Sequence, residues 1–154
     1  ADLKETHKTV VAAKQATIEV FTLTDKGEKK SAGTVQFRVK QVPNPVPVFA
    51  GKKGTDIIKK SDLIKAVAVT IEIPNFEFAL DLPVVSFEVS VPVISGKDTL
   101  EVTESCQGNM LSEKQKILLS RVAPGSKVYI EKVKVTKAGE AVVDIGSVNL
   151  MVIE

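Results

Sequence analysis

The chain has 154 residues, 44% of them apolar, a formal net charge of +2, one cysteine and no tryptophan. A domain of this size buries roughly 70% of the surface of its unfolded chain, so it needs neither disulfides nor a metal to hold a core. The nearly balanced charge argues against a nucleic-acid binder, which neutralises many phosphates. The first residues are polar and no apolar run reaches about 18 residues, so we expect a soluble chain without a signal peptide or membrane helix.

The N-terminal part of the chain predicts a β-hairpin. Residues 17–24 and 33–42 are expected to be strands, and the polar, glycine-containing residues 25–28 are expected to form the turn between them. In the first strand the apolar face changes after Val20, which predicts either a bulge or a strand that leaves one sheet for another. The apolar residues that alternate with polar ones in the second strand are Val35, Phe37 and Val39.

A proline-rich segment, residues 42–54, follows the hairpin. Pro43, Pro45 and Pro47 lack the backbone N–H group that strand pairing uses, and each holds the preceding residue in an extended conformation. We therefore predict a stiff extended connector here and place a domain boundary between residues 42 and 43.

The rest of the chain predicts further strands, from runs that are apolar at every second residue or nearly throughout: 67–73, 85–93, 128–135 and 141–154. Turns are expected at residues 95–98 and 137–140. The alternation shifts phase near Glu131, which leaves open a bulge or a crossing between sheets. The last run, apolar on both sides, is expected to be one largely buried strand. These short spacings favour an all-β fold with mostly antiparallel sheets.

Two short helices are expected among the strands. Ser112 and Gln115 have the spacing of a capping box, in which each side chain bonds the backbone N–H of the other. The inward face of this helix is predicted to carry Leu111, Leu118, Leu119 and Val122, with Lys114 and Arg121 outside. A helical turn from Ser61 is expected to carry Leu63 and Ile64 inward.

Residues for nucleophilic or metal chemistry are scarce. His7, the only histidine, lies in a polar terminal stretch, where a catalytic base is poorly held. Cys106 has no second cysteine to pair with, and we interpret it as a small buried thiol. The acidic residues along the central strands are expected on the solvent face of a sheet: Glu72, Glu77, Asp81 and Glu88. We therefore predict no enzyme, no cofactor, no metal and no small-molecule substrate.

A basic patch is the one candidate site. Residues 51–55 look slightly like a phosphate-binding loop, but they lack its glycine–lysine spacing. The patch consists of Lys52, Lys53, Lys59 and Lys60. It is either a solvated loop or a docking surface for an acidic partner. Few aromatic residues remain outside the expected core for stacking on nucleic-acid bases, so no nucleic-acid partner is expected.

Several strings in the chain are familiar in their order. They are FRVKQVPNPVPVFAGKKG from Phe37, FEFALDLPVVSFEVSV from Phe76, LSEKQKILLSRVAPGSKVYIEKVKV from Leu111, and the closing SVNLMVIE. Together they resemble the last periplasmic domain of the GldM/PorM family, which serves gliding motility and type IX secretion in Bacteroidota. The resemblance covers residues 37–154 well and the first 36 residues poorly.

This resemblance implies an immunoglobulin-like β-sandwich in the periplasm. Family members have an N-terminal inner-membrane helix, outside the present chain, that pairs with GldL/PorL. A dimeric rod follows, and its last domain is thought to reach the outer-membrane-associated ring of GldK/PorK and GldN/PorN. The implied role is a non-catalytic module that docks the motor rod to this ring. The family has no catalytic residues that could be transferred to this chain.

The resemblance also implies an identity for each of the two predicted domains. Residues 43–154 become the C-terminal sandwich. Residues 1–42 become the end of a preceding immunoglobulin-like domain, or strands exchanged with a second copy, because a lone hairpin is marginal in water. We therefore expect a homodimer. Two other functions stay open: a generic sandwich adhesin that binds carbohydrate or protein, and an enzyme that hydrolyses glycan or peptide.

Overall fold

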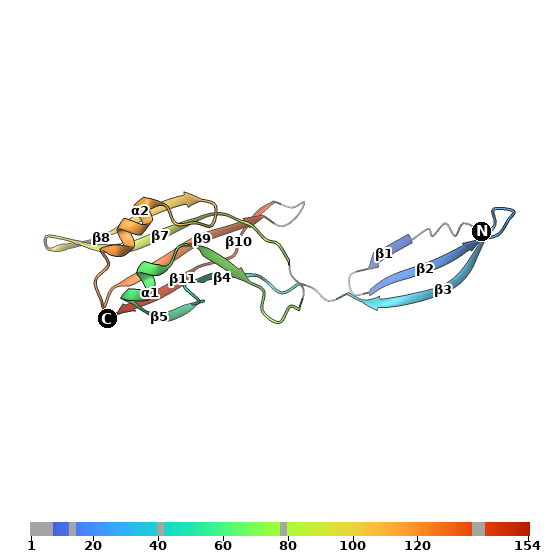
Figure 1. Cartoon of the computed structure of the whole chain (residues 1–154), viewed down its shortest axis with the longest axis horizontal. Coiled ribbons are helices and arrows are strands. Elements are labelled where there is room, and N and C mark those ends of the chain that lie inside the picture. Colours follow the sequence, from blue (N-terminus) through green and yellow to red (C-terminus); the bar gives the residue numbers. More distant parts are fainter. Residues whose placement is uncertain (1–7, 13–14, 40–41, 78–79, 137–140) are drawn as a thin grey trace. The chain divides into compact units, whose positions relative to one another are not determined.

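A computed structural model of the chain describes residues 8–12, 15–39, 42–77, 80–136 and 141–154 (Figure 1). The chain divides into two compact units, Ala1–Val42 and Pro43–Glu154. We refer to them as unit 1 and unit 2 and describe each by itself. His7 and the turn predicted at residues 137–140 lie outside the described residues.

Unit 1 is an antiparallel sheet in the order β1-β2-β3, with β1 Lys8–Ala12, β2 Gln15–Leu23 and β3 Lys29–Arg38. The predicted hairpin turn is confirmed, since the Gly27 N–H donates to the Thr24 carbonyl at 2.8 Å. Val20 pairs with Gly33 and Phe21 with Ser31, which leaves one extra residue in β3. A bulge is therefore present at the position where the apolar face of β2 changes, but its extra residue, Ala32, lies in the partner strand β3.

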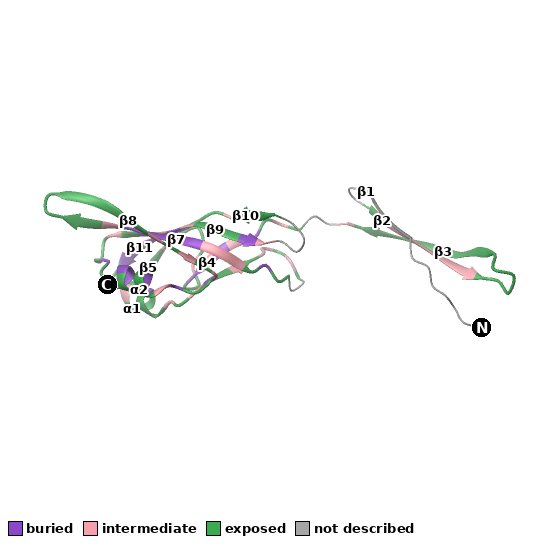
Figure 2. Ribbon diagram, turned by 90° about the horizontal axis from the view of Figure 1, so that it is seen from above, coloured by how far each residue is buried: buried purple, intermediate pink, exposed green. Residues whose placement is uncertain are grey.

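The described side chains of unit 1 form no buried core (Figure 2). Ala16 pairs with Phe37 and Ile18 with Val35, so these four side chains share one face of the sheet. Val35 and Phe37 are about half exposed, at 52% and 50%. Unit 1 is thus an amphipathic sheet with an uncovered apolar face.

Unit 2 is built on a six-stranded sheet in the order β5-β11-β9-β7-β8, with β10 also paired to β9. Only the β5–β11 pair is parallel, and the other described pairs of this sheet are antiparallel. The strands are β5 Thr55–Lys59, β7 Val84–Ser95, β8 Asp98–Gln107, β9 Lys127–Thr136, β10 Val142–Asp144 and β11 Val148–Ile153.

A second, smaller layer packs against this sheet. It contains the antiparallel pair of β4 Val46–Phe49 and β6 Val69–Glu72, with the helices α1 Lys60–Lys65 and α2 Glu113–Ser120. The two layers share one apolar cluster, which includes Phe49, Leu63, Val69, Phe87, Val89, Leu119, Val128, Ile130 and Leu150. The prediction of an all-β, mostly antiparallel, sandwich-like fold with short helices is confirmed.

The prediction that residues 42–54 form only a stiff extended connector is wrong, because this segment contains strand β4, which contributes to the packed core. Phe49 is fully buried and belongs to the core, and Pro45 and Pro47 are buried with it. Strand β4 pairs with β6 alone, so one of its edges needs no hydrogen-bond donors. A proline is compatible with such an edge strand, which is why Pro47 does not exclude it.

The phase shift near Glu131 is a bulge. Strand β9 stays paired with β7 on both sides of the shift, and Lys132 has the left-handed φ of +49° that the extra residue requires. The prediction of a single buried final strand is wrong, because β10 and β11 are separated around Gly146. The β10 side chains are exposed, whereas Val148, Leu150 and Val152 of β11 are buried.

Two inward-facing predictions near α1 are also wrong. Leu63 is buried as expected, but Ile64 is 55% exposed because a six-residue helix turns only one narrow face to the core. Val67 precedes β6 and is exposed as well. The α2 prediction is confirmed, with Leu111, Leu118, Leu119 and Val122 buried and Lys114 and Arg121 exposed.

Candidate interaction surfaces

The predicted basic patch is divided by its own ion pairs. The Lys52 ammonium lies 3.2 Å from the Asp56 carboxylate, and the Lys53 ammonium lies 2.7 Å from that of Glu72. The Ile57 backbone N–H and the Lys52 ammonium hold the pKa of Asp56 below its ordinary value. All four charged side chains are partly in solvent, where such pairs contribute little to stability. Half of the predicted positive charge is therefore matched within unit 2.

Lys60 has a structural role that its sequence context did not indicate. Its ammonium donates to the carbonyls of Leu119, Ser120 and Val122 at 2.9, 2.7 and 2.6 Å. These carbonyls lie at the C-terminal end of α2, where backbone acceptors lack helical partners and positive charge is favoured. Partial burial lowers the pKa of Lys60, and the three acceptors offset that burial. Docking to a partner through these lysines stays a prediction, and Lys59 is exposed and therefore accessible for its test.

We expect Lys60→Met to destabilise unit 2 by about 2 kcal/mol, because three carbonyl groups lose their donor while the aliphatic stem is retained. Lys59→Met is the matched control, since Lys59 is exposed and its substitution should change stability by less than about 0.5 kcal/mol. Urea unfolding followed by circular dichroism measures both. Equal midpoints for the two variants would contradict the role of Lys60.

The backbone of residues 51–55 does not have the conformation of a phosphate-binding loop. The Phe49 and Lys52 N–H groups each donate to the other residue's carbonyl, at 2.8 and 2.9 Å. This closes a tight turn in which Ala50 and Gly51 both have positive φ. The chain continues into strand β5 and not into a helix, so no helix N-terminus is available for phosphate here.

The described residues also assemble no reactive centre that we can identify. Within them no group of three metal-ligating side chains is close enough to hold an ion. The Cys106 thiol donates to the Met110 carbonyl at 3.3 Å, and burial raises its pKa, which favours the unreactive protonated form. Ser90 is buried and bonds Thr103 and Glu131 at 2.9 and 3.0 Å, and none of the described residues is a histidine. Glu72 and Glu88 lie on different sheets, and each forms an ion pair with a lysine, Lys53 and Lys132 respectively.

The β7–β8 hairpin carries apolar side chains beyond the core. Its tip projects at one end of unit 2, opposite the end where the chain enters β4 (Figure 1). Val91 pairs with Val102 and Val93 with Leu100, so all four share one face of the hairpin. Val91 is buried and Val102 is half-buried, but Val93 is 37% and Leu100 56% exposed, so the apolar face becomes more exposed toward the tip. Ile94, on the opposite face, is 78% exposed.

A groove of about 380 Å³ lies between the hairpin and the end of α2. The hairpin lines it with residues 91–94 and Val102, α2 lines it with Leu118, and the residue that caps the end of α2, Arg121, completes this side. We call this surface the tip groove. The sequence had signalled the Gly96–Lys97 turn but not the groove, which needs the distant α2 as its other side.

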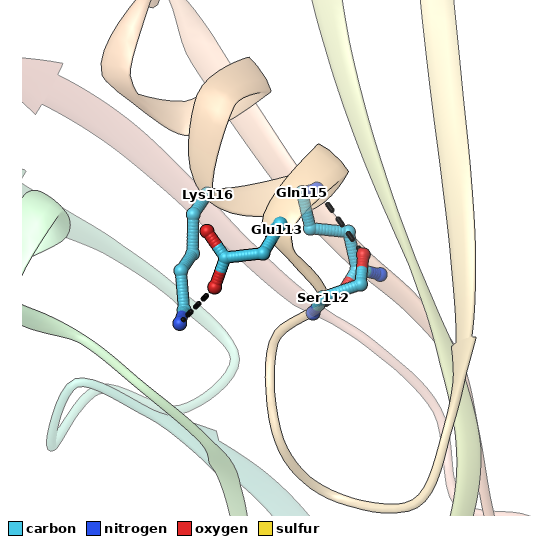
Figure 3. Close-up of polar contacts among 4 residues, drawn as sticks. All are labelled: Ser112, Glu113, Gln115 and Lys116. Carbon is cyan, nitrogen blue, oxygen red and sulfur yellow. Dashed lines mark hydrogen bonds and ion pairs between the residues drawn. The ribbon is translucent and has the colours of Figure 1, made fainter.

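The helix beside the tip groove is fixed firmly (Figure 3). The Ser112 hydroxyl accepts from the Gln115 N–H at 3.2 Å, and the Gln115 side-chain oxygen accepts from the Ser112 N–H at 3.0 Å. The Gln115 amide also donates to the Glu104 carbonyl of β8 at 2.9 Å. An ion pair of 2.8 Å joins Glu113 and Lys116 on the exposed side. The predicted capping box is therefore confirmed, and it ties α2 to β8.

Comparison with known protein families assigns unit 2. A family model described as the GldM C-terminal domain matches residues 43–153, which is nearly the whole of unit 2. The chain belongs to the GldM C-terminal domain family. No curated protein matches the chain.

Family membership indicates the machinery to which unit 2 belongs. A GldM-family domain is a component of the gliding-motility and type IX secretion machinery. Among the residues described here, no helix is long and apolar enough to cross a membrane.

Proposed function

We propose that this chain is a non-catalytic periplasmic module that docks a membrane-anchored motor rod to the outer-membrane-associated ring of GldK/PorK and GldN/PorN. The family match over residues 43–153 carries this proposal. The fold supports it, because a rigid two-layer sandwich transmits force between its ends without needing a catalytic cleft. In this arrangement GldL/PorL would contact the anchored part of the full protein and not the present chain.

A second part of the proposal concerns unit 1. Its apolar face, formed by Ala16, Ile18, Val35 and Phe37, is not covered by the side chains of the unit that the structure describes. Half-exposed apolar side chains on one face of a sheet are unfavourable in water, and burying them against another surface is favourable. We propose that a second copy of the chain covers this face, either by packing or by strand exchange, and that the chain is a homodimer.

Val35→Asp tests the dimer, because it places a charge on the apolar face of unit 1. We expect it to convert the dimer to a monomer in light scattering, whereas Thr34→Asp should leave the dimer intact. Thr34 is the adjacent residue on the opposite face of β3, so it is a matched control. A wild-type monomer whose strands β1–β3 resist protease would contradict the dimer.

The docking role is tested in cells that depend on the full-length protein. Removal of residues 43–154 should block secretion through the machinery while the truncated protein still associates with GldL/PorL. Secretion at the wild-type level, with the truncated protein present at normal abundance, would contradict the proposed role of unit 2.

A further inference from the structure

The tip groove is an extension of the core that lacks its covering side chain. The apolar ladder of β7 and β8 continues from Val91 and Val102 to Val93 and Leu100, beyond the reach of Leu118. Exposed apolar surface of this kind is unfavourable in water and marks sites where another molecule binds. A ligand that inserts one aliphatic or aromatic side chain would complete the packing.

Charge at the groove defines a second property of the ligand. Of the described residues that line it, only Arg121 is charged. No described carboxylate lies within ion-pair distance of its guanidinium. Glu101 pairs with Pro92 in the hairpin and is not among the residues that line the groove. A free guanidinium beside an apolar slot is complementary to a carboxylate beside an apolar side chain.

We propose that the tip groove binds a segment of the ring proteins in which an aliphatic or aromatic side chain lies next to a carboxylate. The apolar side chain packs on Val93 in the groove and on Leu100, which pairs with Val93 and lies beside the groove, and the carboxylate pairs with Arg121. This inference rests on the proposed docking function and assigns it a surface. The position supports it, because the β7–β8 hairpin that lines the groove has its tip at the end of unit 2 away from the entry of the chain (Figure 1).

The test is a titration of the whole chain against the purified ring, with variants on and off the groove. Leu100→Ser and Arg121→Glu should each weaken binding at least about tenfold, as anchor residues of an interface do. The weakening by Arg121→Glu should shrink at high salt, because it acts through charge. Val93→Ser provides a second apolar variant.

Matched controls lie elsewhere on unit 2. Ile64→Ser removes an apolar side chain that is 55% exposed, against 56% for Leu100. Lys114→Glu reverses an exposed charge on α2, the helix that Arg121 caps at its C-terminal end. Both should change the affinity less than about twofold. Thermal unfolding of all five variants verifies that unit 2 stays folded.

Three other outcomes of this titration would each contradict the inference. If the ring binds the wild-type chain and all variants equally, the tip groove is not the docking surface and the proposed function stands. If the ring does not bind the wild-type chain, the proposed function and this inference both fail. If Leu100→Ser alters self-association of the chain and not ring binding, a second copy occupies the groove and the inference is overturned.

Discussion

Phe49→Ala is expected to destabilise unit 2 by about 3–5 kcal/mol, the cost of removing a buried phenylalanine from a packed core. Phe49 is 0% exposed and joins the cluster that holds the two layers together. A domain with a total stability of roughly 5–15 kcal/mol loses a large part of it through such a change. The variant should therefore unfold at a much lower urea concentration, with cooperative loss of the β-sheet signal.

Phe37→Ala is the matched control, since it makes the same chemical change in a side chain that is half exposed and lies in unit 1. The unfolding midpoint of unit 2 should stay close to that of the wild type. If Phe49→Ala behaved like Phe37→Ala, the segment before Gly54 would be the bare connector that its prolines suggest and not part of the core.

Gln115→Ala is expected to cost about 2–4 kcal/mol, because it leaves two backbone groups without partners and opens a small cavity. Gln115 is fully buried, and its amide serves both the Ser112 N–H and the Glu104 carbonyl. Gln107→Ala, at an exposed position of β8, should change stability by less than about 0.5 kcal/mol. Urea unfolding of the two variants checks this difference.

Gln115→Glu separates the polar contacts from the volume of the side chain. The introduced carboxyl keeps an acceptor for the Ser112 N–H but, when ionised, faces the Glu104 carbonyl without a proton. Burial should raise its folded-state pKa above the unfolded value of about 4.3. The folded state then binds more protons, so stability falls as pH rises through this window. The deficit relative to the wild type should be larger near neutral pH than in acid, and a pH-independent deficit would contradict this account.

Features encoded within a few residues could be predicted from the sequence. The α2 cap follows from Ser112 and Gln115 alone, and the β2–β3 turn follows from residues 25–28. The alternation of Phe87, Val89 and Val91 placed β7 correctly, since period two belongs to a strand with one buried face.

Features that depend on distant contacts could not be predicted. Lys60 bonds to carbonyls 59 to 62 residues further along the chain, so its local charge pattern suggested a docking patch. Strand β8 is mostly polar because it forms a sheet edge, and only the turn before it was predicted. The burial of Phe49 was not predicted, because the neighbouring prolines indicated a connector rather than a strand of the core. The tip groove needs β7, β8 and α2 together, and no local pattern contains all three.

Direct binding of the chain to the ring tests the central claim that unit 2 is a docking module. The whole chain is titrated against immobilised, purified GldK/PorK–GldN/PorN ring, and in parallel against glycan from the cell envelope. We predict saturable binding to the ring that excess free chain competes away, and none to the glycan. Saturable binding to the glycan without binding to the ring would contradict the account and identify a carbohydrate-binding sandwich.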